Sequence, residues 1–223
     1  MKINVEDSKL YGRLKYARHG VFILVGTGQH GKTVTMHALL NSPLMENRNV
    51  ALLNYPPQFV KAYLPERYRA VKWPEDIYDV PKIVHAGKDV LAIDDAVFFA
   101  GARSHATRRN KDIQQFLTIS SHHELFIIIC IQNLSLLDFS LVQSQDVFLI
   151  HKQMDITSLA FERPEMKRKQ VIANAQIRNA IKSYPELHPK GWSYCSTTWE
   201  LLFNGLPAYW VPQLSKPFFG VIP

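Results

Sequence analysis

Residues 26–33 read Gly-Thr-Gly-Gln-His-Gly-Lys-Thr and satisfy the pattern GxxxxGK[ST] in full. They follow the β-rich apolar run 21–25, and the helix-compatible run 32–40 comes next. A glycine-rich turn between a strand and a helix brings consecutive backbone N–H groups to phosphate oxygens at the helix N-terminus. The stretch therefore predicts a phosphate-binding loop formed by Gly26, Thr27, Gly28, Gln29, His30, Gly31, Lys32 and Thr33. The alternative is a glycine-rich turn that matches the pattern by chance.

Two side chains of this loop suit it to a nucleotide. Lys32 brings a positive charge to the β- and γ-phosphates, and the Thr33 hydroxyl can bind Mg²⁺. A guanine nucleotide would require an Asn-Lys-x-Asp motif after a strand, and residues 110–112 lack both the spacer and the strand. We therefore expect ATP and Mg²⁺ as the cofactors.

An acidic pair follows a second apolar strand about sixty residues downstream. Residues 90–93 read Val-Leu-Ala-Ile, and Asp94 and Asp95 come directly after them. Asp94 is the candidate for the metal, while Asp95 is placed to orient and polarise an attacking water, as phosphoryl transfer demands. The alternative is a solvated pair of aspartates at the end of a strand.

Gln132 is a third polar residue at the end of a strand. It follows residues 125–131, the longest uninterrupted apolar run of the chain. The carboxyl ends of parallel strands share one edge of a sheet, so the Gln132 amide is expected near the γ-phosphate or the attacking water. The alternative is a solvated loop glutamine.

Strands and helices alternate along most of the chain. Expected strands cover residues 21–25, 50–54, 68–73, 89–93, 125–131 and 147–151, and expected helices cover 32–40, 75–86, 112–121 and 162–182. This alternation predicts an α/β fold with a mostly parallel central sheet and helices on both faces. We expect a core over residues 1–151. Residues 152–223 form a basic helical segment and a Pro- and aromatic-rich tail, packed on the core or on a neighbouring subunit.

Composition sets the broad class of protein. The chain has 223 residues, with 26 Lys and Arg against 19 Asp and Glu, for a net charge of +7. This size predicts one large domain, and the apolar and charged fractions exclude a disordered or coiled-coil protein. No apolar run approaches the roughly 20 residues that span a bilayer, and no secretory signal is visible. Two cysteines in unrelated contexts fit a reducing compartment, so we expect a soluble cytoplasmic protein.

Together these residues resemble the P-loop ATPases that carry an additional catalytic acid, and within them the FtsK/HerA-type motors and virus genome-packaging ATPases. Loop 26–33 corresponds to Walker A, residues 90–95 to Walker B, and segment 122–132 to a strand that ends in a nucleotide-sensing Gln. The resemblance covers about residues 20–150. It implies that the strand ending at Gln132 lies between the two Walker strands. The family often has Asp-Glu where this chain has Asp94-Asp95.

The resemblance leaves one catalytic residue unplaced. In such motors an arginine acts in trans as a finger about eleven residues before the sensor Gln, and that position falls on Ser121. Either Arg103, Arg108 or Arg109 takes the role, with Arg108 and Arg109 preferred, or the finger comes from Arg163 or Arg178. Each of these arginines can also be an ordinary surface charge.

If the resemblance holds, the chain forms a homo-oligomeric ring, commonly a hexamer. This ring moves double-stranded DNA by ATP hydrolysis and packages a viral genome into a capsid. A capsid or portal protein would then be a partner, and the host cytoplasm or the virion the location. Basic clusters suit contact with the phosphate backbone: residues 103–111 carry four positive charges and no acid, and residues 152–190 carry eight basic against four acidic residues.

Three other functions remain open, and one of them is a nucleotide-dependent switch that does little chemistry. A zonula occludens toxin-like phage assembly or extrusion ATPase normally carries a transmembrane segment, which this sequence lacks. A small-molecule or nucleotide kinase needs an Arg-rich lid, and residues 103–111 can be read as one. Stimulation of ATP hydrolysis by DNA would separate a motor from a kinase.

Overall fold

The computed structural model describes residues 7–53, 55–72, 89–94, 124–137 and 147–215. The expected helices 75–86 and 112–121 lie outside these residues. Five helices are described: α1 (Lys9–Leu14), α2 (Lys32–Leu40), α3 (Pro57–Tyr63), α8 (Ile156–Ala160) and α9 (Pro164–Ser183). Short 3-10 turns are η2 (Leu134–Leu136), η3 (Pro189–Gly191) and η4 (Pro212–Ser215).

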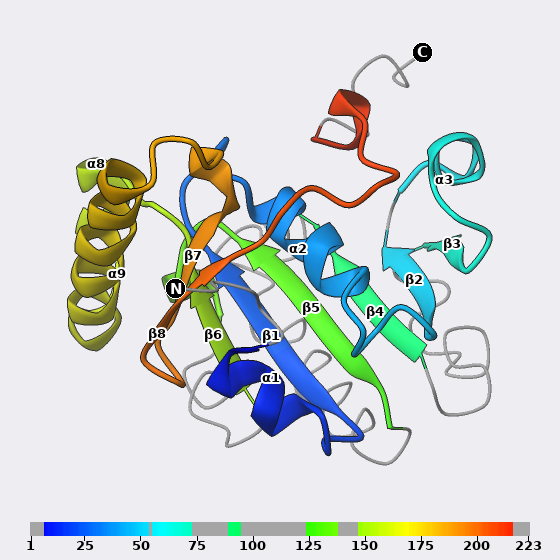
Figure 1. Cartoon of the computed structure of the whole chain (residues 1–223), viewed down its shortest axis with the longest axis horizontal. Coiled ribbons are helices and arrows are strands. Elements are labelled where there is room, and N and C mark those ends of the chain that lie inside the picture. The colour runs from blue at the N-terminus through cyan, green and yellow to red at the C-terminus, as the bar shows by residue number, and fades with distance from the viewer. Residues whose placement is uncertain (1–6, 54, 73–88, 95–123, 138–146, 216–223) are drawn as a thin grey trace, which may run out of the picture.

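A central sheet of eight strands organises the molecule (Figure 1). Its strands are β1 (Gly20–Val25), β2 (Asn49–Leu53), β3 (Tyr68–Val71), β4 (Asp89–Ile93), β5 (Phe126–Ile131), β6 (Val147–His151), β7 (Trp192–Cys195) and β8 (Glu200–Phe203). The spatial order is β3-β2-β4-β5-β1-β6-β7-β8. All pairs from β3 to β6 are parallel, whereas β6–β7 and β7–β8 are antiparallel. The predicted mostly parallel α/β sheet is confirmed.

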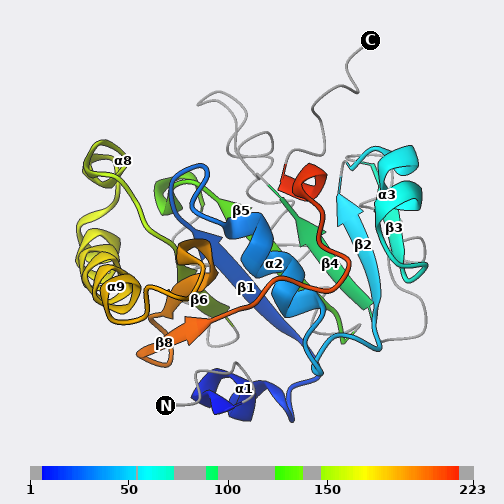
Figure 2. The same ribbon diagram turned by 45° about the horizontal axis from the view of Figure 1, so that its top comes forward.

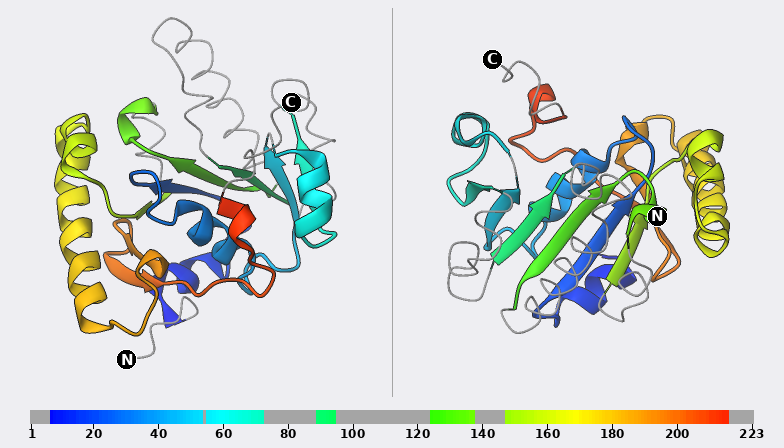
Figure 3. Two further views of the ribbon diagram at one scale, coloured as in Figure 1. Left: turned by 90° about the horizontal axis from the view of Figure 1, so that it is seen from above. Right: turned by 180° about the vertical axis from the view of Figure 1, so that it is seen from behind.

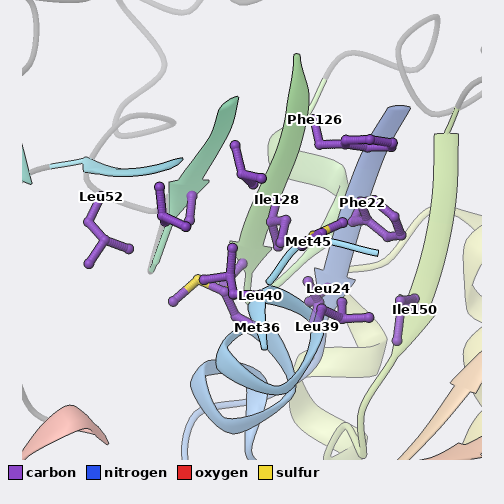
Figure 4. Close-up of a cluster of buried hydrophobic side chains, with 14 of the residues drawn as sticks. Phe22, Leu24, Met36, Leu39, Leu40, Met45, Leu52, Phe126, Ile128 and Ile150 are labelled. Carbon is purple, nitrogen blue, oxygen red and sulfur yellow. The ribbon is translucent and has the colours of Figure 1, made fainter. Parts of the chain in front are cut away.

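Buried apolar strands explain why the sheet forms where the sequence places it. Strands β1, β5 and β6 are buried along their whole length, as expected for parallel strands covered on both faces. Helices α1 and α2 lie on one face of the sheet (Figure 3). There Met36, Leu39 and Leu40 of α2 pack against Leu24 and Ile128 of β1 and β5 (Figure 4). This packing fixes α2, and with it the loop that precedes α2, over the carboxyl ends of the strands.

Residues after β6 extend the same sheet. Strands β7 and β8, which sequence reasoning did not predict, pair antiparallel beyond β6, and α9 packs on β7 through Ala173, Ile177 and Trp192. Helix α9 begins at Pro164, where a proline is well tolerated, close to the expected range 162–182. Helices α9 and α3 lie at opposite ends of the sheet (Figures 1 and 3).

The segment after β8 crosses the outer side of α2 and leads to η4 (Figures 1 and 2). Here the Tyr209 hydroxyl lies 2.7 Å from that of Tyr68 and 3.3 Å from His37 Nδ1, and the ring of Trp210 contacts His37 edge-on. The C-terminal part is therefore tied to the helix that follows the loop. In the described parts of the chain, no helix is long and apolar enough to cross a membrane.

Candidate functional site

The carboxyl ends of five parallel strands meet at one edge of the sheet. Strand β1 leads into the glycine-rich loop, β4 into Asp94, β5 into Gln132, β6 into Lys152, and β2 toward Tyr55. Ligands of open α/β sheets bind at this edge. Strand β5 lies between β1 and β4, so the strand order that the resemblance implies is confirmed.

The loop between β1 and α2 takes a conformation that depends on glycine. Gly31, at the N-cap of α2, has φ +86°, in the left-handed region that L side chains rarely adopt. A Cβ there would also lie 2.6 Å from the Lys190 carbonyl oxygen. At Gly26 a Cβ would lie 2.7 Å from Cβ of Lys152. Gly26 and Gly31 are the first and last glycines of the pattern. Both are required because other segments of the same chain lie too close to leave room for a Cβ.

Lys32 is folded back onto its own loop. Its Nζ donates to the carbonyl oxygens of Gly26, at 2.7 Å, and Thr27, at 3.1 Å. Lys32 is 8% exposed. The ammonium thus lies inside the loop that would surround a phosphate, where a phosphate oxygen could replace these carbonyls as its acceptor.

Two hydroxyl groups converge on Asp94. Thr33 Oγ1 and the Tyr55 hydroxyl each donate to Asp94 Oδ2, both at 2.9 Å. The sequence predicted Thr33 and Asp94 as metal-side partners, and the structure brings them together across 61 positions of sequence. Tyr55 was missed. It is buried, and burial followed by the charge of Asp94 raises the pKa of its hydroxyl well above the usual value.

The oxygens of Thr33 and Asp94 suit a hard cation. Magnesium in nucleotide sites is held by few protein oxygens, with phosphate and water completing the octahedron. Within the described residues, no three His, Cys, Asp or Glu side chains gather as a metal site. The pair Thr33–Asp94 therefore fits Mg²⁺ brought by a nucleotide better than a metal caged by protein alone.

Some of the remaining predicted site residues lie in the described parts of the chain, and the others lie outside them. Gln132 follows β5 directly and is exposed at the site edge. Arg163 donates through Nη2 to the Leu137 carbonyl, while Arg178 is exposed on α9 and donates through Nε to the Asn174 carbonyl. Residues outside the described parts of the chain are Asp95, Arg103, Arg108, Arg109 and Ser121.

The chain directly after β6, residues 152–155, supports the phosphate loop. We call this segment the strip. The Thr27 N–H donates to the Gln153 carbonyl at 3.2 Å, and Thr27 Oγ1 accepts from the Asp155 N–H at 2.9 Å. Hydrogen bonds from the Ser158 N–H and the Thr157 hydroxyl lower the pKa of the Asp155 carboxyl to about 2. Partial burial and then the charge of Lys32 lower the pKa of His30 in the loop.

Helix α9 holds this strip from its other side. Asn174 accepts from the Met154 N–H at 3.0 Å and donates to the Met154 carbonyl at 2.8 Å. Gln170 donates to the Lys152 carbonyl at 2.7 Å, and its Oε1 lies 2.7 Å from His151 Nδ1. Sequence reasoning missed these residues, because amides on a basic helix carry no signal of a partner 18 or 20 positions away.

The loop, the strand order and the Thr33–Asp94 contact define a P-loop NTPase fold. Comparison of the sequence with known protein families finds no match, and comparison with curated proteins finds none either. Solved structures do match. The DNA-packaging ATPase B204 from Sulfolobus turreted icosahedral virus is 15% identical, over 84% of this chain and 98% of that one, with a TM-score of 0.52.

Two further structures are similar to the same extent. The genome packaging NTPase B204 from Sulfolobus turreted icosahedral virus 2, solved with AMP, is 15% identical over 85% of this chain and 98% of that chain, with a TM-score of 0.52. The cytoplasmic domain of the type VII secretion ATPase EccC from Thermomonospora curvata is 10% identical over 84% of this chain and 24% of that chain, also at 0.52. At such identities the likeness establishes the fold of the chain.

Proposed function

We propose that this chain is an ATPase that moves double-stranded DNA, most concretely one that packages a viral genome into a capsid. The observation that carries the ATPase part is the contact between Thr33 Oγ1 and Asp94 Oδ2 beside the glycine-rich loop. The packaging part is supported by the fold shared with B204 of two viruses, which is a packaging enzyme by name. The host cytoplasm or the virion is the corresponding location.

The reaction follows from the residues at the sheet edge. Lys32 exchanges the carbonyls of Gly26 and Thr27 for phosphate oxygens, and the loop N–H groups bind the phosphates. Thr33 and Asp94 would hold Mg²⁺, which would supply positive charge to offset that of the phosphates. Asp95 orients a water and accepts its proton as the oxygen attacks the γ-phosphorus and the bond to the bridging oxygen breaks. Gln132 contacts the γ-phosphate or the water.

Helix α9 provides the surface for DNA. It carries five Lys and Arg residues against one Glu, and Lys167, Arg168, Arg178 and Lys182 are exposed. A basic face without a base-reading motif suits sequence-independent contact with phosphates. The alternative is an ordinary solvated helix face.

A ring, commonly a hexamer, would complete each site with an arginine of the neighbouring subunit. We prefer Arg108 or Arg109 for this finger, over Arg163 or Arg178. Mixing an arginine-to-alanine subunit with an Asp95→Asn subunit that keeps its arginines should restore part of the turnover. Absence of rescue would favour Arg163 or Arg178, tested in the same way. A capsid or portal protein would receive the DNA.

The experiment that tests the function is steady-state ATP hydrolysis with and without long double-stranded DNA, at low and moderate salt. We expect stimulation by DNA that weakens as salt rises, because phosphate contacts release counterions. Lys32→Ala should abolish turnover, and retained hydrolysis in that variant would overturn the site assignment. Turnover that DNA does not stimulate would instead favour an extrusion ATPase of the zonula occludens type or a kinase, and phosphoryl transfer to an acceptor would identify the kinase.

A further inference from the structure

A buried lysine lies directly behind the phosphate loop. Lys152 follows β6 and is 1% exposed. Its Nζ donates to Thr35 Oγ1 at 3.2 Å, to the Lys190 carbonyl at 2.7 Å and to the Trp192 carbonyl. An ammonium has three N–H donors, and each here has an acceptor, so the cavity can accommodate the charged form. The sequence reasoning counted Lys152 only as one charge of a basic segment.

Lys152 links the segments of the chain that support the phosphate loop. Its backbone N–H donates to the Val25 carbonyl at 2.7 Å, and its Cβ lies 2.7 Å from the position that a Cβ on Gly26 would take. The Lys190 carbonyl that it holds is the atom packed against Gly31. Thr35, its third partner, lies in the first turn of α2. The ammonium therefore fixes the supports of both ends of the loop.

The electrostatic surroundings make this cation responsive to an anion in the loop. Burial and then the charge of Lys32 lower the pKa of the Lys152 ammonium to about 7. The groups facing it are Lys32 and Thr35 of α2, His30 of the loop, the 190–192 chain and Gln170 of α9. Its neighbour His151 is neutral near pH 7, because burial lowers the pKa of that imidazole to about 4. Polyphosphate in the loop would offset the charge of Lys32 and favour the charged form of Lys152.

We propose that Lys152 is a positioning residue of the phosphate loop and a buried counter-charge for the nucleotide, so that nucleotide binding is accompanied by proton uptake at its Nζ. The proposal rests on the proposed nucleotide-binding function and deepens it. The proton comes from solvent, and the bond formed is the third N–H of the ammonium. No electron transfer or leaving group is involved.

The sign of the pH dependence follows from linkage. Binding favours the protonated form, so affinity is highest below pH 7, falls as the pH rises above 7, and levels off above the pKa of the bound state. Each unit by which the nucleotide raises this pKa strengthens binding to the protonated form about tenfold. Uptake is therefore expected at pH 8 and should be smaller at pH 6.

Calorimetry of ADP binding at pH 8, in buffers of different ionisation heat, tests the proposal. The wild-type protein should take up a measurable fraction of a proton. Lys152→Arg keeps the charge but does not titrate, so it should show only the background that ADP and the loop residue His30 contribute. Lys152→Met should bind ADP about tenfold or more weakly. The matched control is Lys190→Ala, which removes a neighbouring exposed charge but keeps its carbonyl, and should retain the uptake.

Equal uptake by the wild-type protein and Lys152→Arg would overturn the proposal. If both Lys152 variants fail to fold, the wild-type protein still decides: absence of measurable proton uptake at pH 8, where His30 with its lowered pKa takes up little, contradicts the proposal. ADP binding without ATP hydrolysis would defeat the proposed ATPase and leave this inference intact. A wild-type protein that binds no nucleotide would defeat both.

Discussion

The carboxylate of Asp94 shares one oxygen between two donors, and this sharing gives Tyr55 a role. Thr33 and Tyr55 both donate to Oδ2 at 2.9 Å. If Thr33 bound a metal as proposed, Tyr55 would remain as the hydrogen-bond donor that fixes the orientation of the carboxylate. Hydrogen-bond donors behind metal ligands typically contribute 10–100-fold to metal affinity.

Tyr55→Phe should therefore weaken binding of Mn²⁺, used as a spectroscopic substitute for Mg²⁺, by about tenfold in the presence of ADP. Electron paramagnetic resonance of unbound Mn²⁺ measures this without turnover. Tyr68→Phe is the matched control, because the Tyr68 hydroxyl is hydrogen-bonded to Tyr209 and Arg67 rather than to Asp94. Equal metal affinity in the two variants would show that Tyr55 does not position Asp94.

The glycines of the loop should differ in their tolerance of a side chain. Gly31→Ala places a Cβ 2.6 Å from a backbone oxygen in a left-handed conformation, which by itself costs about 1–2 kcal/mol. Around Gly28 an added Cβ meets nothing within 4 Å. We expect Gly31→Ala to lower the free energy of unfolding by about 2 kcal/mol or more, and Gly28→Ala to change it by less than about 0.5 kcal/mol. Urea unfolding without nucleotide is the measurement, and similar losses in both variants would contradict the packing argument.

At the level of elements, α9 is connected to the loop through the chain after β6. Asn174 binds both backbone groups of Met154, and the next residues of that strip bind Thr27. A helix whose outer face is basic is thus joined, through hydrogen bonds, to the residues beneath the phosphate loop. Under the proposed function, contact of DNA with α9 would therefore have a physical route to the nucleotide site.

Asn174→Ala should leave the Met154 N–H and carbonyl without their side-chain partner. Loss of partners for buried polar groups costs about 1–3 kcal/mol, and we expect weaker nucleotide binding because the strip under Thr27 loosens. Asn179→Ala on the exposed face of the same helix is the control. Urea unfolding and ADP titration of both variants check this. The idea fails if Asn174→Ala retains wild-type ADP affinity while its stability falls.

Across the whole molecule, two buried histidines secure the C-terminal part to the core. His37 of α2 contacts Tyr209 in the segment that crosses it. His151 at the end of β6 contacts Ser196 beyond β7, with Nε2 to Oγ at 2.9 Å. Burial lowers the pKa of His37 to about 3 and that of His151 to about 4. Both are therefore neutral in the folded protein near pH 7.

Acid should weaken the folded state through these two side chains. Below about pH 6.5 the unfolded chain binds protons that the folded protein does not, so stability falls as the pH drops from 6.5 toward the folded-state pKa values. Each histidine contributes up to about 1.4 kcal/mol per pH unit in that range. Urea unfolding between pH 6.5 and 5 measures the slope. His151→Gln should reduce it by about half, and an unchanged slope would exclude His151 as a cause.

Local patterns predicted the elements that are specified by nearby residues. Helix 32–40 and strands 89–93 and 147–151 have the expected bounds, because apolar runs and glycine breaks act over a few residues. Strands β7 and β8 were missed because each has four residues and pairs at the end of an existing sheet. Their stability comes from contacts with β6 and α9, which lie beyond the few residues that a local pattern covers.

The same distinction applies to the candidate site. The loop 26–33, Asp94 and Gln132 were predicted from sequence as site residues, because chemistry at strand ends has a short-range signature. Tyr55, Lys152, Gln170 and Asn174 have no such signature, since each acts through a partner that only the folded chain brings near. A nucleotide loop can be recognised from eight consecutive residues. The groups that hold it in place are chosen by packing between distant segments, and packing depends on the tertiary structure.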